Sequence, residues 1–165
     1  MSINNFLRKF RIEIISNRRE STKVAMEKFE DEPLIVAEIG VEDGYNARDL
    51  QKALNIKEFH LIDICPTKKA FKMKNKNEKW YLCPSSEADV PKCDFIYIDG
   101  SHEFKDVKID LEKYWEFVEE GGILAGHDIQ YLDVSKAVLQ FANKNNLEIN
   151  FGDRRDWWII KDKRR

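Results

Sequence analysis

The stretch LIVAEIGVEDG, residues 34–44, decides how this chain folds. An apolar run reaches Glu38, glycines follow at Gly40 and Gly44, and a helical pattern begins immediately afterwards. A strand that passes through glycines into a helix brings backbone close to a ligand and offers it unpaired N–H groups. An acidic side chain at the strand end can accept hydrogen bonds from hydroxyls or an ammonium group. The stretch therefore predicts a pocket for a nucleoside-bearing cofactor.

Apolar and helical segments alternate along the rest of the chain. Nearly all-apolar strands such as FIYID, alternating with helices, are typical of a parallel sheet covered by helices on both faces. The last two strands are short, are joined by the polar turn GDRRD, and should pair as an antiparallel hairpin. We predict an α/β fold with a doubly wound, mostly parallel, seven-stranded Rossmann-like sheet. Strands are expected at 34–41, 58–64, 79–83, 94–98, 122–127, 147–151 and 157–161, and helices at 45–55, 67–74, 104–119 and 133–145.

The first thirty residues differ from the rest. Apolar residues fall at helical spacing from Ile3 to Ile14, which predicts one or two amphipathic helices over residues 3–29. We therefore expect a helical cap at 1–30 and a Rossmann-like domain at 31–165. The cap could cover the pocket, complete the pocket of a neighbouring subunit in a homo-oligomer, or merely shield the sheet.

Composition excludes several classes of protein. The chain has 165 residues, 42% of them hydrophobic, and 28 basic against 30 acidic residues, which favours one domain without a general bias toward nucleic acid or membranes. Its three cysteines lack C-x-x-C spacing, so neither a disulfide framework nor a zinc site is expected. No apolar run has the length of a signal peptide or membrane span, and we expect a cytoplasmic protein. The segment 68–79 carries six lysines and one glutamate, which we expect to be a solvated surface.

The carboxyl ends of the predicted strands carry polar side chains. Ligands of open α/β sheets bind beyond these ends, so the residues there should surround one crevice. These residues are Glu38 to Gly44, Asp63, Ser85 with Ser86, Asp99 to His102, and His127 with Asp128.

Some of these residues have two interpretations. Asp63 could accept both hydroxyls of a ribose, or could cap a helix ahead of Pro66. Asn46 could be a helix N-cap, or could face a carboxylate held at the helix start. Glu42 occupies the second glycine position of G-x-G-x-x-G, so a nicotinamide cofactor is not expected.

Three motifs together carry a family resemblance. AEIGVEDGYNA resembles motif I of class I S-adenosylmethionine-dependent methyltransferases, and FHLID resembles their acidic second motif. The stretch IDGSH, an amphipathic helix and EGGILAGHD resemble the fourth and fifth strands of one branch, the small-molecule O-methyltransferases of the catechol, caffeoyl-CoA and macrolide-sugar type. The resemblance covers residues 34–130 and implies a methyltransferase domain.

The resemblance implies a role for each matching residue. Glu38, Gly40 and Gly44 would line the methionine part of S-adenosylmethionine, with Asn46 near its carboxylate. Asp63 would hold the ribose. Ser85 would lie beside the adenine, with Ser86 as the second choice for this position.

A divalent metal is also implied, because metal-dependent members bind one through an acid at the Asp99 position and two adjacent residues matching His127 and Asp128. His127 departs from the usual Asp with Asp or Asn. Mg²⁺ prefers oxygen ligands, whereas imidazole suits softer ions such as Mn²⁺, Fe²⁺ or Zn²⁺. The alternative is that His127 packs at the strand end and Asp128 caps the next segment, without a metal.

Methyl transfer to a hydroxyl requires a base near the acceptor. His102 lies three residues beyond Asp99, where metal-dependent relatives carry a lysine or another polar group, and an ordinary histidine pKa of about 6.5 suits a general base. The alternative is that His102 lies on the surface, or that it is buried in the core with its hydrogen bonds satisfied there. Asp99 and His102 are thus the predicted catalytic residues.

The expected function is methylation of a small-molecule hydroxyl, on a sugar or a phenol. A non-catalytic module that binds S-adenosylmethionine or a partner is the first alternative. A nucleic-acid methyltransferase that uses the lysine-rich segment 68–79 is the second.

Overall fold

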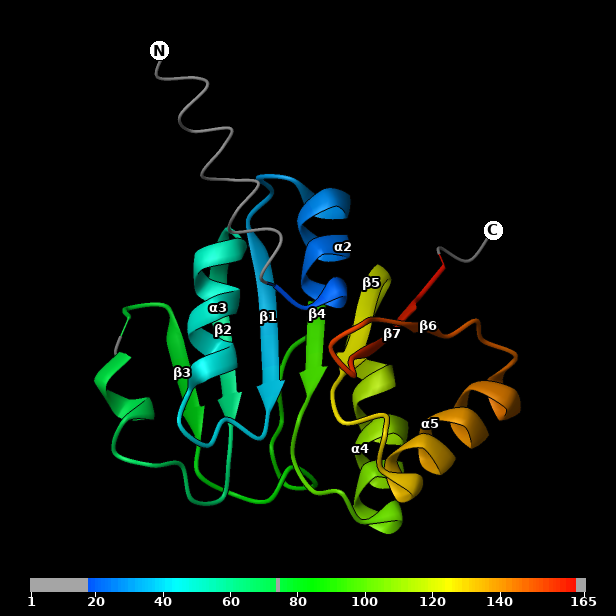
Figure 1. The fold of residues 1–165 in the computed structure, drawn as a ribbon. Coiled ribbons are helices and arrows are strands. Elements are labelled where there is room, and N and C mark those ends of the chain that lie inside the picture. The colour runs from blue at the N-terminus through cyan, green and yellow to red at the C-terminus, as the bar shows by residue number, and fades with distance from the viewer. Residues whose placement is uncertain (1–17, 74, 163–165) are drawn as a thin grey trace.

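The computed structural model describes residues 18–73 and 75–162. Within this part of the chain, seven strands form a single sheet (Figure 1). The strands are β1 (Leu34–Ile39), β2 (Ile56–Ile62), β3 (Glu78–Tyr81), β4 (Cys93–Ile98), β5 (Val118–Gly126), β6 (Asn150–Phe151) and β7 (Trp157–Ile160). Their order is β3-β2-β1-β4-β5-β7-β6, with β1 to β5 parallel and β7 antiparallel to both β5 and β6. The predicted doubly wound sheet and its closing hairpin are confirmed.

Helices cover both faces of the sheet (Figure 1). On one face lie α2 (Glu20–Phe29) and α3 (Tyr45–Ala53), and on the other lie α4 (Phe104–Phe117) and α5 (Leu132–Asn145). The helix predicted at 67–74 is a single 3-10 turn, η1 (Ala70–Met73). Of the amphipathic helices predicted over residues 3–29, residues 3–17 lie outside the described part of the chain. In the described part, no helix is long and apolar enough to cross a membrane.

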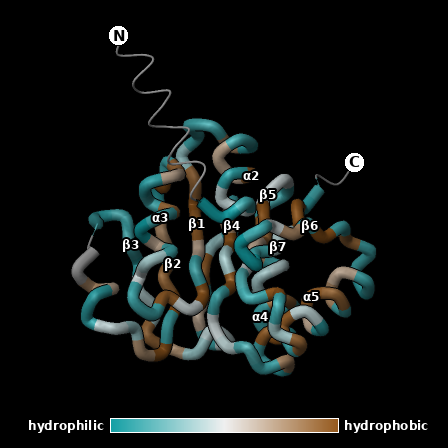
Figure 2. The backbone as a smooth tube through the Cα atoms, in the orientation of Figure 1, coloured by the Kyte–Doolittle hydropathy of each residue, from teal (hydrophilic) through white to brown (hydrophobic). Residues whose placement is uncertain are grey.

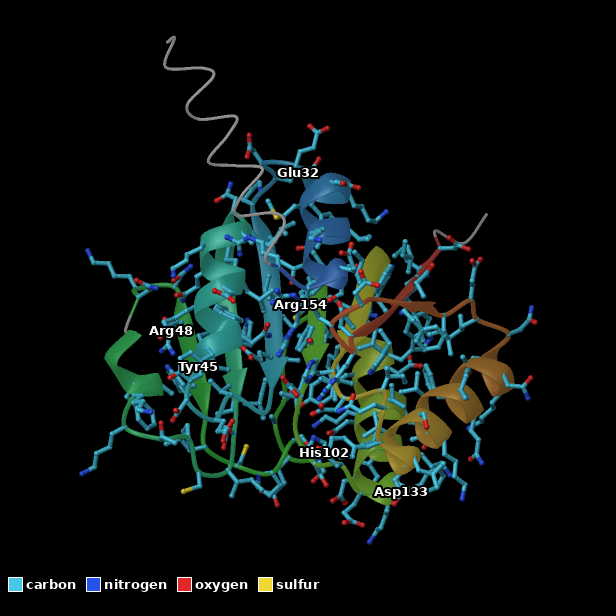
Figure 3. All side chains as sticks on the ribbon, in the orientation of Figure 1. Glu32, Tyr45, Arg48, His102, Asp133 and Arg154 are labelled. Atoms are coloured by element: carbon cyan, nitrogen blue, oxygen red, sulfur yellow. The ribbon has the colours of Figure 1, made fainter. Side chains whose placement is uncertain are left out.

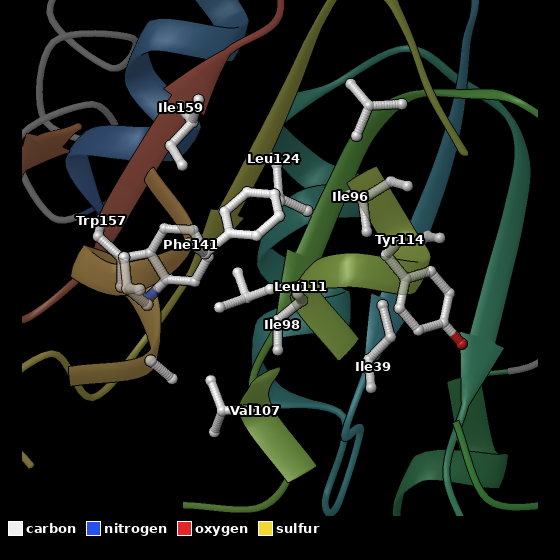
Figure 4. Close-up of a cluster of buried hydrophobic side chains, with 14 of the residues drawn as sticks. Ile39, Ile96, Ile98, Val107, Leu111, Tyr114, Leu124, Phe141, Trp157 and Ile159 are labelled. Atoms are coloured by element: carbon white, nitrogen blue, oxygen red, sulfur yellow. The ribbon is translucent and has the colours of Figure 1, made fainter. Parts of the chain in front are cut away.

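The two cores follow from the alternation of side chains along each strand. In β4, Phe95 and Tyr97 pack toward α2 and α3, whereas Ile96 and Ile98 pack toward α4 and α5. Since both faces are covered, the central strands β1 and β4 are largely apolar, as the brown segments of Figure 2 show. Figure 4 shows the second core, where residues of α4 and α5 meet strand residues and Trp157 of the hairpin.

The strand β5 begins four residues earlier than the sequence predicts, at Val118 instead of residue 122. Val118 pairs with Cys93, and the register then shifts before Ile123 pairs with Phe95. The intervening Gly121 has a φ of 85°, which explains why this segment resembles a turn in the sequence. The irregularity lies at the amino end of β5 and leaves its carboxyl end at the predicted site.

Candidate active site

A cavity of about 580 Å³ lies beyond the carboxyl ends of β1 to β4. The strand order reverses between β1 and β4, and this switch point is where ligands of open α/β sheets bind. Seven of the residues predicted from the sequence line the cavity, namely Gly40, Asp63, Ser85, Ser86, Asp99, His102 and Asp128. The other four, Glu38, Gly44, Asn46 and His127, are not part of its lining.

The loop after β1 owes its path to glycine. Gly40 has a φ of 83°, and a Cβ placed there would lie 2.2 Å from the carbonyl oxygen of Asp99. Glycine is therefore needed to bring the loops after β1 and β4 into contact, in addition to any approach to a ligand. Gly44, with a φ of 73°, is the N-cap residue of α3. Asn46 lies within the helix, so its interpretation as the N-cap is wrong.

Asp63 holds the loop after β1 in place. Its Oδ2 accepts hydrogen bonds from the backbone N–H groups of Val41 and Glu42, both at 2.8 Å, and its Oδ1 accepts one from Cys65 at 2.8 Å. Glu42 has a φ of 48°, a left-handed conformation that these bonds stabilise. The next helical turn begins only at Ala70, so Asp63 does not cap it.

Glu38 is a buried carboxyl group behind the cavity wall. Its exposed fraction is 1%, and its Oε1 accepts a hydrogen bond from Asn46 Nδ2 at 3.1 Å. Burial raises the pKa of Glu38 to about 8, although the bond from Asn46 opposes the rise. Its Oε2 is buried and has no hydrogen-bond partner in the described structure. The group is therefore mostly protonated at neutral pH, and a cationic donor beside Oε2 would favour its ionised form.

The loop after β3 is fastened to α4. Lys113 Nζ donates to the carbonyl oxygens of Ser85 and Ser86, at 2.8 and 2.9 Å, and Tyr114 Oη donates to that of Ser85 at 2.9 Å. The Ser85 hydroxyl donates to Asp110 Oδ1 at 2.5 Å. Sequence reasoning missed Asp110, although an acidic residue on the apolar face of this helix was a usable signal.

His102 is oriented by two neighbours across the mouth of the crevice. Its Nε2 lies 2.7 Å from Asp128 Oδ2, and its ring stacks on Tyr131 with centroids 4.6 Å apart. Figure 3 places His102 at the edge where the arrows of the parallel strands end. A histidine held by a carboxylate in this way has the arrangement of a general base with its orienting acid.

Asp128 has a strained backbone and several partners. Its φ is 60°, which is uncommon for a residue other than glycine and is frequent at functional sites. Burial favours a higher pKa for Asp128, but the hydrogen bond from Gln130 and the neighbouring His127 and His102 outweigh it and hold the pKa below its ordinary value. The carboxylate is therefore ionised at neutral pH.

His127 is fixed by the hairpin turn. Its Nε2 lies 2.9 Å from the carbonyl oxygen of Arg154, and a carbonyl only accepts, so Nε2 carries the hydrogen. Nδ1 then faces Asp128 Oδ1 at 3.1 Å and Asp99 Oδ1 at 3.7 Å. One ligand atom from each of Asp99, His127 and Asp128 lies within 4.8 Å of the others, so the predicted metal ligands are brought together.

The amino-terminal region supplies a cation that sequence reasoning missed. Arg19 Nη1 donates to Tyr97 Oη at 2.5 Å and lies 3.3 Å from Asp99 Oδ2. Burial raises the pKa of Asp99, and the charges of Arg19 and His127 oppose this. Close by, Asp156 of the hairpin turn accepts the backbone N–H of Ser21 at 2.7 Å and so caps α2. No local motif marks these contacts, because they join residues 78 to 135 positions apart in the sequence.

A family model described as a methyltransferase domain matches residues 37–129, more than half of the chain. The chain belongs to this methyltransferase family. It is a class I enzyme that uses S-adenosylmethionine. Among curated proteins, none matches its sequence.

Solved structures share the fold of this methyltransferase at low sequence identity. The ribosomal protein L11 methylase of Lactobacillus delbrueckii subsp. bulgaricus is 18% identical, with a TM-score of 0.64, over 87% of this chain and 77% of that one. The N-methyltransferase NodS of Bradyrhizobium japonicum WM9, in complex with S-adenosyl-L-homocysteine, is 12% identical, with a TM-score of 0.61, over 88% and 86%. A tRNA methyltransferase of Aquifex aeolicus is 17% identical, with a TM-score of 0.66, over 88% and 69%. These likenesses concern the fold and leave the acceptor open.

Proposed function

We propose that this methyltransferase methylates a hydroxyl group of a small molecule such as a sugar or a phenol. The observation that carries the proposal is the joint lining of one cavity by Asp63 and Ser85, on the side suited to a nucleoside, and by His102 and Asp128, on the side suited to proton removal. A methyl donor and an acceptor hydroxyl can meet between these two sides. The family resemblance to small-molecule O-methyltransferases agrees with this assignment.

The nucleoside side would hold S-adenosylmethionine. A carboxylate offers about four lone-pair positions. Three are used by backbone donors at Asp63, which leaves capacity for a ribose hydroxyl. Glu38, whose Oε2 lacks a partner, would pair with the ammonium of the methionine part, and Asn46 would lie near its carboxylate. Ser85 and Ser86 would border the adenine.

The acceptor side would remove a proton. S-adenosylmethionine supplies a methyl group on a sulfonium, which an attacking oxygen takes by in-line displacement. Because His102 Nε2 is turned to Asp128, its Nδ1 is left to accept the proton of the acceptor hydroxyl. Asp128 would hold the ring in place and stabilise the imidazolium that forms.

Asp99, His127 and Asp128 would hold a divalent metal ion, with Mn²⁺ suiting the nitrogen ligand better than Mg²⁺. The hydrogen bond from His127 Nε2 to a backbone carbonyl supports this fit, because ligating histidines usually donate their other N–H in this way. A bound ion would lower the pKa of the acceptor hydroxyl. We expect Mn²⁺ to bind the wild type and to bind His127→Gln at least tenfold more weakly. Equal binding to both, with activity unchanged in chelator, would contradict the metal site.

The experiment that tests the proposed function is transfer of a radiolabelled methyl group to a panel of sugars and phenols and, separately, to RNA. Two of the lysines in segment 68–79 are paired, Lys69 with Asp43 and Lys79 with Glu58, which makes a nucleic-acid groove there less favourable. We expect transfer to a hydroxyl compound. Transfer to RNA alone, or cofactor binding without transfer to any acceptor, would contradict the proposal.

A further inference from the structure

We propose that Asp110 binds the exocyclic amine of the cofactor's adenine and makes this methyltransferase selective for an adenosyl cofactor. The proposal rests on the assignment of the cavity to S-adenosylmethionine. It adds a residue on α4 to the binding site, whose other members lie on β1, on α3 and in the loops after the strands.

The position of Asp110 carries the first step. Its exposed fraction is 3%, yet it lines the cavity beside Ser85. Oδ1 accepts the hydrogen bond from the Ser85 hydroxyl. Oδ2 faces the loop after β4, where a Cβ at Gly100 would lie 4.0 Å from it. Within residues 18–73 and 75–162, no hydrogen bond reaches Oδ2.

A purely structural role explains this carboxyl group poorly. The Ser85 loop is already held by Lys113 and Tyr114, which bind its backbone carbonyls. The Ser85 hydroxyl satisfies Oδ1, whereas Oδ2 is left to the solvent of the cavity and has no side-chain donor there among the described residues. Burial raises the pKa of Asp110 to about 6, against the effect of the Ser85 bond, so the group is mostly ionised at neutral pH. Its free oxygen can therefore accept a hydrogen bond from a ligand.

The rest of this part of the cavity suits a flat base. Ile62, Ile64 and Ile109 also line it and provide apolar surface for the faces of a purine. Adenine presents a 6-amino donor to a carboxylate, whereas hypoxanthine presents a 6-oxo acceptor that the carboxylate repels. A single oxygen of Asp110 is thus sufficient to distinguish the two bases.

Calorimetric titration with S-adenosyl-L-homocysteine and S-inosyl-L-homocysteine tests this inference. The wild type should bind the adenosyl compound about 10 to 100 times more tightly, as expected for a hydrogen bond to a charged group. Asp110→Asn should lose this preference or reverse it, because an amide can donate to the 6-oxo group. Lys113→Met loosens the same loop without touching the base. It should therefore weaken the binding of both compounds equally.

The outcomes separate the possible failures. If Asp110→Asn weakened the binding of both compounds equally, Asp110 would only hold the loop, and the inference would be overturned. A wild type without preference would also overturn it, even if Asp110→Asn does not fold. A wild type that binds neither compound would overturn the assignment of the cavity itself, and the role of Asp110 with it.

Discussion

The two sides of the crevice are assembled differently. On the cofactor side, Asp63 binds backbone about 20 residues away at Val41 and Glu42, and Ser85 binds Asp110 within 25 residues. On the acceptor side, Arg19 reaches Asp99 across 80 residues, and the nearby Ser21 reaches Asp156 across 135. The cofactor side is therefore formed by segments that are close in the sequence, whereas the acceptor side also depends on segments near the two ends of the chain. Changes near the chain ends should therefore alter methyl transfer to the acceptor without altering the affinity for the cofactor.

Of the variants considered, His102→Ala should show the largest difference between its effect on methyl transfer and its effect on cofactor binding. Loss of a general base typically reduces the rate by about 10² to 10⁴. The affinity for S-adenosyl-L-homocysteine should change less than about threefold, because the nucleoside contacts lie elsewhere in the cavity. The measurements are kcat with an acceptor found in the panel and the calorimetric Kd. Wild-type turnover in this variant would contradict the assignment of the base.

A change on the cofactor side, Glu38→Gln, should alter the pH dependence of stability. The folded pKa of Glu38 is about 8, above its ordinary value of 4.5, so the wild type loses free energy of unfolding as pH rises through this window. Removing the ionisable group should make the variant more stable than the wild type near pH 8, by as much as a few kcal/mol at about 1.4 kcal/mol per pKa unit. Below about pH 4.5 the difference should disappear.

Urea denaturation at several pH values measures this effect. Glu58→Gln is a matched control, because the hydrogen bond from Lys79 holds the pKa of Glu58 below its ordinary value. The stability of the control should show no gain over the wild type toward pH 8. Parallel curves for Glu38→Gln and the wild type would mean that Glu38 is ionised in the folded protein.

Gly40→Ala should affect both sides together. The added Cβ meets the backbone of Asp99 at a positive φ, so we expect a loss of roughly 2–3 kcal/mol of unfolding free energy and weaker cofactor binding. Gly100→Ala is the control, since its Cβ would meet no atom closer than 3.6 Å, and it should cost less than about 1 kcal/mol. Equal losses measured by denaturation would show that contact between these loops does not matter.

The sequence predicted the parts of this molecule that depend on local pattern. Alternating apolar and helical segments predicted the sheet, and the carboxyl ends of parallel strands necessarily bring Gly40, Asp63, Asp99 and Asp128 together. The grouping of Asp99 with His127 and Asp128 as metal ligands was implied by the family resemblance, and their side chains do lie together.

The sequence could not predict contacts between distant segments. Arg19 reaches Asp99 from the residue before α2, and Asp156 of the hairpin turn holds the first turn of that helix, but no spacing rule links these positions. The hydrogen on His127 Nε2 depends on a backbone carbonyl at Arg154, which has no signature of its own. The early start of β5 was missed because Gly121 and Gly122 resemble a turn.

The smallest expected effect is that of Asp156→Ala. Loss of the cap on α2 should cost about 1 kcal/mol of unfolding free energy. Displacement of Arg19 from Asp99 should lower methyl transfer while leaving the cofactor Kd unchanged. Asp153→Ala, an exposed change in the same turn, should do neither. A weakened Kd in Asp156→Ala would show that the two sides are not independent.

The most direct test is calorimetric titration of three proteins with S-adenosyl-L-homocysteine. We predict that the wild type binds, that His102→Ala binds within about threefold of it, and that Asp63→Asn binds at least about tenfold more weakly. Asn keeps the shape of Asp63 and removes its charge. No binding by the wild type at millimolar ligand would contradict the account, as would equal weakening by His102→Ala and Asp63→Asn.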